Sequence, residues 1–316
     1  MNRFAALAIT LTTSVLLTSS AQTQYPKVLP HFAGETTIPA APKRIVALGP
    51  HMLDILLSLG VQPVGYGEAA QLSVTNYGQP LKQIRYLGRY VTSSPINVGN
   101  RFNPSLEVLL SLKPDLLIGE NFAQAAYPNL SKIAPTLLFD GTSHEGWKTG
   151  LQTIATALGR EARAQAVIKN YQQTISAAKA KLAPIIAGKK LLIAWNGGFP
   201  ADSLYTVYGA QDYTGGLMRE LGFTLMTAGA KETKVSPEAM PAFDPDIVIV
   251  LAGNASKPEI ARRDWESNAV LQTMRASKNK QVYYLEIQLF GRIRGPIAAG
   301  LIIENLERVL SGKQPR

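Results

Sequence analysis

Three arginines have the chemistry to hold an anionic ligand. Arg101 lies in a Gly-Asn-Arg loop just before a predicted helix, and Arg292 and Arg294 are two residues apart, which on an extended strand would place them on one face. A guanidinium group binds a carboxylate through two parallel hydrogen bonds and does not lose its proton. These side chains therefore predict a site for a ligand that carries carboxylate groups.

Several aromatic residues lie in or near loops that follow predicted strands. Such loops are where α/β proteins bind their ligands, and aromatic rings there can form a wall around the organic part of a ligand. Ordinary core packing is the alternative for each of them. The candidates are Trp195, Phe199, Tyr205, Tyr208 and Phe290.

One long motif occurs twice, at residues 105–118 and 236–249, an offset of 131 residues. Each copy has Ser, then Glu two residues later, then Pro-Asp followed by three apolar residues. A repeated unit of this length predicts two lobes of like architecture. Glu107 and Glu238 stand near the start of the predicted helix in each copy, where a carboxylate favours the helix dipole. Together they could also offer one anionic contact per lobe to a basic partner surface.

A single long helix is predicted between the two copies, at residues 159–184. Its apolar residues recur in steps of four and three, which describes one helix face, and Gly159 and Pro184 mark its ends. A helix that links the lobes resists large hinge bending, so we expect only a small closure on ligand binding. The face consists of Ala164, Ile168, Tyr171, Ile175, Ala178 and Leu182.

Buried strands alternate with helices on both sides of this helix, which predicts an α/β fold with parallel-rich sheets flanked by helices. A short strand is also expected around residues 85–87. The expected organisation has a ligand cleft between the lobes, and its segments are a signal peptide (1–21), an N-terminal arm (22–41), an N-terminal lobe (42–158), a linking helix (159–184) and a C-terminal lobe (185–316).

The N-terminus has the pattern of a secretory signal peptide. Arg3 precedes an apolar run over residues 4–17, and small residues lead to an expected cleavage after Ala21. A membrane anchor is the alternative, but the run is short for the roughly 20 residues that span a bilayer. The chain has no cysteine, so disulfides, thiolate sites and a lipid anchor on a cysteine are not expected.

The net charge and the absence of certain motifs limit the classes of function that we expect. A net charge of +10 suits an anionic ligand or surface, whereas the scattered basic residues and the expected export argue against nucleic acid. No Gly-x-Ser-x-Gly and no His-Glu-x-x-His motif occurs, which argues against an enzyme. His31, His51 and His144 lack helical pairing with a second ligand, so direct metal coordination is not expected.

Taken together, these motifs resemble the helix-linked substrate-binding proteins of ABC importers, and within them the iron(III) dicitrate and ferric-siderophore binders. The resemblance extends over residues 40–310. It rests on the repeated motif, the single central helix, and the sequences at 98–107, 132–136 and 292–299.

The resemblance implies a periplasmic protein that captures a ferric siderophore of the citrate, carboxylate or hydroxamate type and delivers it to an ABC permease for iron uptake. It implies that Arg101, Arg292 and Arg294 lie in the cleft, and that Glu107 and Glu238 dock onto arginines of the permease. The iron would be wrapped by its chelator, and no other cofactor is expected. We expect a monomer. Haem or a corrinoid is an alternative ligand, and an exported α/β enzyme is a remote alternative.

Overall fold

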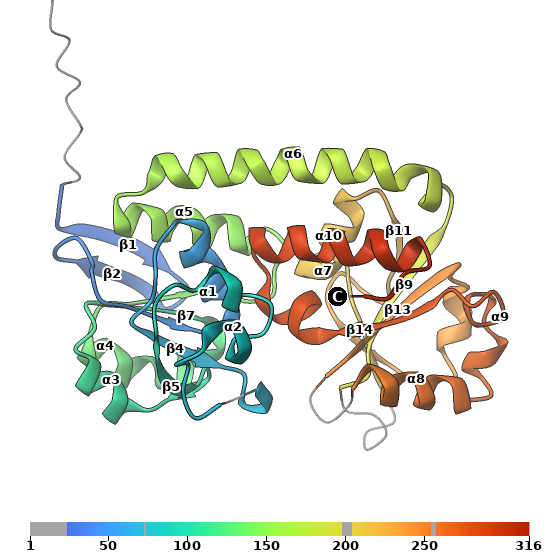
Figure 1. Cartoon of the computed structure of the whole chain (residues 1–316), viewed down its shortest axis with the longest axis horizontal. Coiled ribbons are helices and arrows are strands. Elements are labelled where there is room, and N and C mark those ends of the chain that lie inside the picture. Colours follow the sequence, from blue (N-terminus) through green and yellow to red (C-terminus); the bar gives the residue numbers. More distant parts are fainter. Residues whose placement is uncertain (1–23, 73, 198–203, 254–256, 316) are drawn as a thin grey trace, which may run out of the picture.

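The computed structural model describes residues 24–72, 74–197, 204–253 and 257–315. Two lobes lie side by side, and helix α6 (Glu161–Ile186) runs along both of them (Figure 1). Each lobe contains one six-stranded sheet with helices against it, and a separate two-stranded hairpin lies beside the N-terminal lobe. The predicted α/β class, with two lobes joined by one long helix, is confirmed. The expected signal peptide and Phe199 lie outside the described residues.

The sheet of the N-terminal lobe has the strand order β6-β5-β4-β3-β7-β8. All its strand pairs are parallel except β5 with β6. The strands are β3 (Ile45–Leu48), β4 (Gly65–Glu68), β5 (Ile96–Asn100), β6 (Asn103–Pro104), β7 (Leu116–Glu120) and β8 (Thr136–Phe139). The helices are α1 (Pro50–Ser58), α2 (Pro80–Gln83), α3 (Leu106–Leu112), α4 (Tyr127–Ile133) and α5 (Gly146–Leu158), with 3-10 turns η1 (Ala70–Leu72), η2 (Gly88–Tyr90) and η3 (Asn121–Ala126).

The sheet of the C-terminal lobe has the order β12-β10-β9-β13-β14, with β11 also paired to β9. Strand β10 runs antiparallel to β9 and β12, and the other pairs are parallel. The strands are β9 (Lys190–Trp195), β10 (Tyr205–Val207), β11 (Thr224–Met226), β12 (Thr233–Val235), β13 (Ile247–Ala252) and β14 (Val282–Glu286). The helical segments are α7 (Tyr213–Glu220), η4 (Met240–Phe243), α8 (Pro258–Ser267), η5 (Leu271–Thr273), α9 (Arg275–Lys278), η6 (Gln288–Ile293) and α10 (Pro296–Leu310).

The Pro-Asp of the repeated motif has the same role in both lobes. The Asp115 carboxylate accepts a hydrogen bond of 2.8 Å from the backbone N–H of Arg44, and the Asp246 carboxylate accepts one of 2.8 Å from Lys190. Each aspartate precedes a central strand and thereby ties it to the first strand of its own lobe. The repeat therefore marks equivalent positions in two sheets.

The second copy of the motif does not form the predicted α-helix. Residues 237–239 form a turn that leads into the 3-10 segment η4. The backbone bonds there join residues three apart, as from Met240 N–H to the Pro237 oxygen (3.3 Å). Pro241 has no N–H to donate to the residue four positions earlier, which prevents a regular α-helical turn. Glu238 therefore lies in a turn, whereas Glu107 lies in the first turn of α3.

Helix α6 buries the predicted face: Ala164, Tyr171, Ile175, Ala178 and Leu182 are buried, and Ile168 is partly buried. The helix is displaced by two residues from the expected range. Gly159 instead ends α5, with a left-handed φ of 64°. The helix continues through Pro184 to Ile186, whose side chain is buried in the core.

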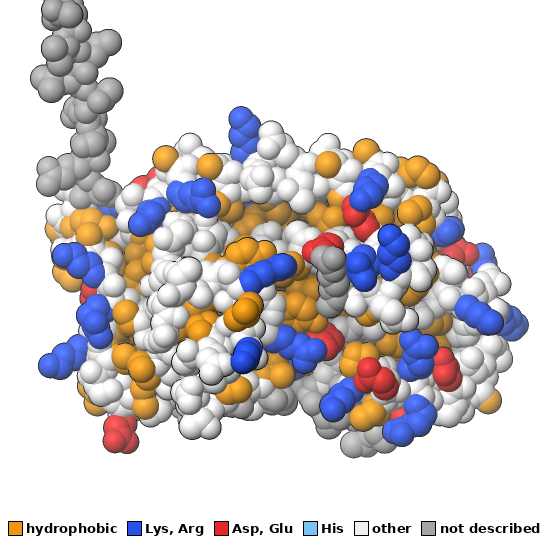
Figure 2. All heavy atoms as spheres, viewed as in Figure 1, with side chains coloured by type: hydrophobic (Ala, Val, Ile, Leu, Met, Phe, Trp, Pro, Cys, Tyr) orange, Lys and Arg blue, Asp and Glu red, His pale blue; other side chains and the backbone are white. Residues whose placement is uncertain are grey.

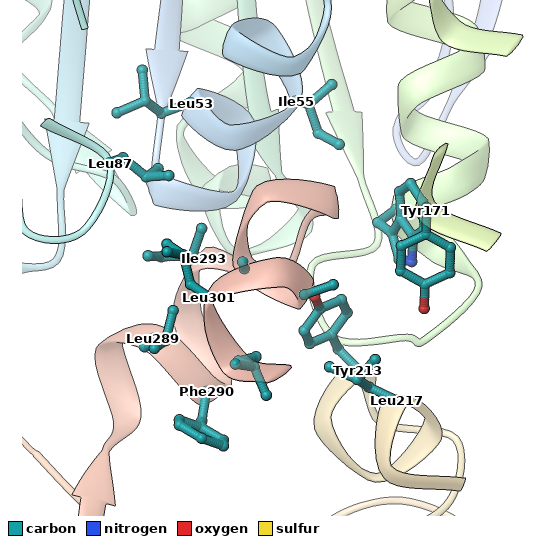
Figure 3. Packing of buried hydrophobic residues seen from close by; sticks show 14 of the residues in the cluster. Leu53, Ile55, Leu87, Tyr171, Tyr213, Leu217, Leu289, Phe290, Ile293 and Leu301 are labelled. Atoms are coloured by element: carbon teal, nitrogen blue, oxygen red, sulfur yellow. The ribbon is translucent and has the colours of Figure 1, made fainter. Parts of the chain in front are cut away.

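A continuous hydrophobic core joins the two lobes (Figure 3). Leu53 and Ile55 of α1 belong to the same cluster as Ile293 of η6 and Leu301 of α10. The Asp54 carboxylate of α1 also accepts hydrogen bonds from the N-terminus of α10, at 3.1 Å from Ile297 N–H and 2.7 Å from Ala298 N–H. These bonds satisfy backbone donors that a helix leaves free at its start. The contact between α1 and α10 is therefore both apolar and hydrogen-bonded.

Three further segments differ from the prediction. The N-terminal arm contains a hairpin of β1 (Lys27–His31) and β2 (Gly34–Ile38), which is tied to β8 by a 2.7 Å bond from Phe32 N–H to the Leu138 oxygen. The strand expected at 85–87 is wrong, because Tyr86 has a φ of 63° and the segment turns between α2 and η2. The sequence analysis also did not predict α5.

None of the helices in the described ranges is both long and apolar enough to cross a membrane. On the face drawn in Figure 2, the Lys and Arg side chains are distributed over both lobes rather than gathered in one patch.

Candidate ligand-binding site

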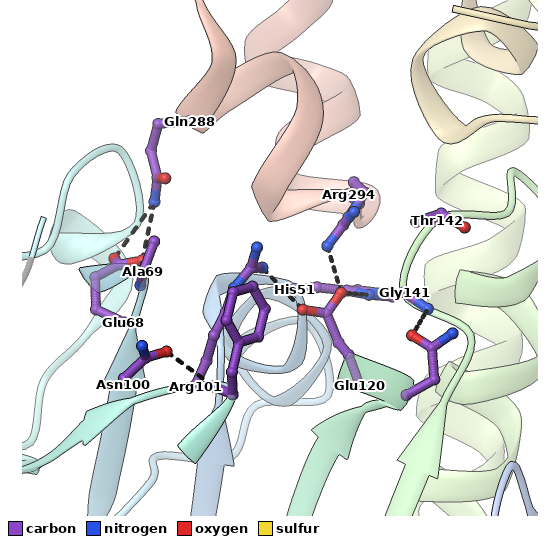
Figure 4. A network of polar contacts seen from close by, with 12 residues as sticks. His51, Glu68, Ala69, Asn100, Arg101, Glu120, Gly141, Thr142, Gln288 and Arg294 are labelled. Carbon is purple, nitrogen blue, oxygen red and sulfur yellow. Dashed lines mark hydrogen bonds and ion pairs between the residues drawn. The ribbon is translucent and has the colours of Figure 1, made fainter. Parts of the chain in front are cut away.

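Two of the arginines predicted to bind the ligand, Arg101 and Arg294, contact the same carboxylate between the lobes (Figure 4). Arg101 follows β5 of the N-terminal lobe, and Arg292 and Arg294 come from η6 and its end in the C-terminal lobe. All three side chains are buried. Burial, with the neighbouring Arg101 as a further cause, lowers the pKa of Arg292 to about 10. The structure therefore brings three positive charges from two lobes into one region.

The local backbone around Arg292 and Arg294 is not the expected strand. Residues 288–293 form a single π-helical turn, and Arg294 has a left-handed φ of 54°. This turn is held by hydrogen bonds from α7: Thr214 Oγ1 donates to the Phe290 oxygen, and Tyr213 Oη donates to the Gly295 oxygen at 2.8 Å. The two arginines are thus positioned by a wound segment that packs on α7, and their spacing in the sequence alone does not place them on one face.

A buried carboxylate, Glu120, lies at the centre of this site. It ends β7, and its Oε2 atom is 2.9 Å from Nη1 of Arg101, while Oε1 contacts Nη2 of Arg294 and lies 3.2 Å from Nδ1 of His51. Burial acts to raise the pKa of Glu120, but Arg294 and Arg101 outweigh it and lower the pKa to about 2. Glu120 is therefore ionised across the physiological range.

A second buried carboxylate, Glu68, ends the nearby strand β4. It accepts a hydrogen bond of 2.6 Å from Tyr66 Oη and one of 2.7 Å from Ala69 N–H. Gln288 of the C-terminal lobe donates to it at 3.3 Å. Burial raises the pKa of Glu68, and these hydrogen bonds oppose the rise. Glu68 is thus hydrogen-bonded by neutral groups, in contrast to Glu120.

Sequence analysis missed both carboxylates. A signal was available, since Glu120 lies two residues after the apolar run of the Pro-Asp motif, at the carboxyl end of a predicted strand. In parallel sheets these ends face the ligand. The repeated motif led us to consider Glu107 at its start and not Glu120 after its end.

The predicted aromatic residues are divided between the site and the core. Tyr208 is buried close enough to Arg294 and Arg292 for both to lower its pKa, although burial raises it overall. Trp195 ends β9 and is partly buried against the core that joins the lobes. Tyr205 packs against Trp265 with ring centroids 5.6 Å apart, in a separate cluster, and Phe290 is fully buried. Tyr205 and Phe290 therefore lie in the hydrophobic core, which was the alternative to a ligand-binding role for each of them.

Two exposed phenylalanines lie beside the arginines and were not predicted. Phe102 and Phe122 are 43% and 39% exposed, and their rings meet edge to face with centroids 5.4 Å apart. The guanidinium carbon of Arg101 is 4.8 Å from the Phe102 ring centroid, and that of Arg294 is 5.7 Å from the Phe122 centroid. These rings therefore extend the site toward solvent as an apolar rim on the N-terminal lobe.

One other group of side chains could in principle bind a metal ion. Among the described residues, His144, Glu145 and Glu220 place candidate ligand atoms within 4.8 Å of one another. Lys148 Nζ, however, lies 3.5 Å from Glu220 and 3.1 Å from Glu145. One ammonium group already pairs with both carboxylates, so the cluster is better described as an ion-pair network.

A cavity of about 820 Å³ lies at another part of the lobe boundary, lined by Arg85, Tyr86 and Glu286 among other residues. None of the three candidate arginines lines it. Arg85 and Tyr86 both contact the Glu286 carboxylate, the latter at 2.8 Å, so the charge of Arg85 is already paired. We therefore place the candidate site at the arginines and not in this cavity.

The low pKa of Glu120 predicts a pH effect on stability. Because the folded pKa of about 2 lies below the ordinary value of 4.5, the stabilisation is complete above pH 4.5 and is lost as the pH falls toward 2. Glu120→Gln should therefore show a shallower loss of melting temperature between pH 4.5 and 2 than the unmodified protein. Thermal denaturation followed by circular dichroism at several pH values measures this, with exposed Glu107→Gln as the control. Parallel curves for Glu120→Gln and the unmodified protein would contradict the assignment.

Comparisons with known proteins identify the family of the chain. Residues 45–289 match the periplasmic binding protein family. The chain is 30% identical to the Fe(3+)-citrate-binding protein YfmC of Bacillus subtilis, over 83% of this chain and 79% of that protein. It is 25% identical to the Fe(3+) dicitrate-binding periplasmic protein FecB of Escherichia coli, over 87% of each chain.

Among solved structures, the crystal structure of Staphylococcus aureus SirA complexed with staphyloferrin B is similar, with a TM-score of 0.73 and 25% identity. The match covers 92% of this chain and 100% of that chain. The resemblance inferred from the motifs is thereby confirmed, and the chain belongs to the periplasmic binding protein family.

Proposed function

We propose that this protein binds a ferric complex of a carboxylate-bearing siderophore between its lobes and delivers it to an ABC permease for iron uptake. The observation that carries the proposal is that Arg101 and Arg294, from different lobes, contact one buried carboxylate, and that Arg292 lies close enough for both to lower its pKa. Relatives that bind ferric citrate, and a structural neighbour complexed with staphyloferrin B, support the same ligand class.

The side chains suit a metal that arrives already chelated. Guanidinium groups do not coordinate iron, but they donate charge-assisted hydrogen bonds to carboxylates at the edge of a ferric complex. Trp195 and Tyr208, with Phe102 and Phe122 on the opposite lobe, would contact the organic part of the ligand. The shared core between α1, η6 and α10 supports the expectation of a small closure.

A titration panel tests the ligand class. Quenching of intrinsic fluorescence is followed with ferric citrate, a ferric trihydroxamate and haem. We expect saturable 1:1 binding of ferric citrate. Binding of haem or a corrinoid alone would favour the alternative ligand class, and chemical conversion of the retained ligand would favour an enzyme. Recovery of the intact coloured complex would support the role of a binding protein.

We propose that the mature protein is a periplasmic monomer. It would carry no cysteine-linked lipid, because the sequence contains no cysteine. N-terminal sequencing of the secreted form should begin at Gln22, because the predicted cleavage follows Ala21. A mature chain that still contains residues 4–17 would contradict this.

Glu107 and Glu238 are proposed as the contacts to the permease. Both side chains are exposed, one on each lobe. Their joint replacement by alanine should lower the rate of iron uptake about tenfold, because two charge contacts to a basic surface are lost, while ligand affinity in solution stays the same. Uptake of radioactive iron and the fluorescence titration measure the two quantities.

The control for this experiment is the double variant Glu35→Ala and Glu259→Ala, which removes two exposed carboxylates elsewhere. It should transport iron at the normal rate. Unchanged uptake by the Glu107/Glu238 variant would exclude the docking role.

A further inference from the structure

The arginines that would bind a ligand carboxylate already bind a carboxylate of this chain. Glu120 is held by Arg101 from its own lobe and by Arg294 from the other lobe (Figure 4). A ligand carboxylate would need the same donors. Glu120 and a carboxylate-bearing ligand are therefore competitors for one set of guanidinium groups.

The enclosure of Glu120 shows that its position is closely defined. A side chain on Gly49, which has a φ of 120°, would place a carbon atom 3.2 Å from Glu120 Oε2. One on Gly141 would come within 2.4 Å of Oε1. Glycine at both positions lets the backbone approach the carboxylate, so Glu120 is closely enclosed by the backbone of its own lobe.

One carboxylate does not satisfy all the donors around it. The Nε–H groups of Arg101 and Arg294 are buried donors that have no hydrogen-bond partner within the described part of the chain. Both side chains are more than nine-tenths buried. Buried donors without acceptors are unfavourable, so this region favours the entry of further acceptor groups.

The contact between Glu120 and Arg294 also joins the lobes. Glu120 ends β7 of the N-terminal lobe, and Arg294 follows η6 of the C-terminal lobe. A ligand that takes over Arg294 replaces one carboxylate with another, so the charge-assisted bond to the guanidinium group is kept. A ligand without a carboxylate breaks the same contact and offers no equivalent acceptor in return.

We propose that Glu120 is a specificity-determining residue: an internal carboxylate that a ligand carboxylate displaces from Arg294, so that the site selects ferric complexes with free carboxylate groups over ferric hydroxamates. This inference rests on the proposed function and names its ligand class. Glu120 retains His51 and Arg101 as partners after the exchange, and it therefore stays ionised in the complex.

The test compares Glu120→Gln with Glu68→Gln in the full-length mature protein. An amide is a weaker acceptor than a carboxylate, so Glu120→Gln frees the guanidinium groups and should bind ferric citrate about tenfold more tightly. A ferric trihydroxamate should gain at least as much, because the variant removes the contact that this ligand breaks without compensation. Glu68→Gln removes a charge of the same sign nearby without breaking an ion pair to an arginine, and it controls for the change in net charge. Its gain should be well below that of Glu120→Gln.

Isothermal titration calorimetry gives the dissociation constants, and a melting curve checks that each variant is folded. Equal gains in the two variants, or an unchanged or weaker affinity in Glu120→Gln, would overturn the exchange. If Glu120→Gln does not fold, Glu120→Asp replaces it, because its shorter carboxylate cannot reach both guanidinium groups, and a gain in the same direction is expected. Failure of the unmodified protein to bind ferric citrate would instead overturn the proposed function.

Discussion

Replacing Arg292 and Arg294 together with glutamine should weaken the binding of ferric citrate by about 10²- to 10⁴-fold. Each guanidinium group is expected to make a charge-assisted hydrogen bond to the ligand, and such a bond contributes about 1.5 to 3 kcal/mol. Both side chains are buried between the lobes, where water screens their charge poorly. Fluorescence titration of the purified double variant measures the loss.

The control for this result is the double variant Arg262→Gln and Arg263→Gln. These two arginines lie on the exposed surface of α8, so the variant loses the same net charge outside the site. Its affinity should change less than about threefold, since exposed charges are screened by salt. Comparable losses in both variants, or full affinity in Arg292→Gln and Arg294→Gln, would show that the site does not bind the ligand through these groups.

Leu53→Ala should lower the free energy of unfolding by about 2 to 5 kcal/mol, because it opens a cavity in a fully buried core. Leu53 of α1 lies in the cluster that joins the lobes, together with Ile293 and Leu301 (Figure 3). The two lobes share this core, so we expect them to unfold in one transition both before and after the substitution. Urea denaturation followed by circular dichroism and by tryptophan fluorescence measures the stability and tests whether the two probes coincide.

Leu110→Ala provides the matched control. Leu110 lies on α3 and is 60% exposed, so its truncation should change the free energy of unfolding by less than about 0.5 kcal/mol. Two separated unfolding transitions, or a small effect of Leu53→Ala, would show that the lobes are energetically independent. In that case a larger hinge motion would be open to the protein.

A shared core changes how the site can discriminate between ligands. If the lobes close only slightly around a small ligand, as we propose, selectivity would come from side chains that exchange partners locally. Glu120 and Arg294 provide such an exchange at the lobe boundary. The shared core at α1 and α10 and the proposed competition at Glu120 therefore belong to one proposal for how the site selects its ligand.

Most of the architecture could be predicted from local sequence patterns. Apolar periodicity predicted the buried face of α6, and the Pro-Asp of the repeated motif marked equivalent strands in two sheets. These features depend on residues near one another in the chain. The three arginines were proposed as ligand-binding residues from their residue type and from the family resemblance, and the extended conformation expected for Arg292 and Arg294 was wrong.

The sequence by itself determined two α/β lobes and a linking helix, and it predicted a basic site, because periodicity, prolines and charge act locally or through composition. Only the tertiary structure decided which partners the arginines have. Glu120 meets Arg294 across 174 residues of chain, and Asp54 meets Ala298 across 244. Pairs so distant are set by how the lobes pack, and that packing also placed Tyr205 and Phe290 in the core and exposed Phe102 and Phe122 beside the site.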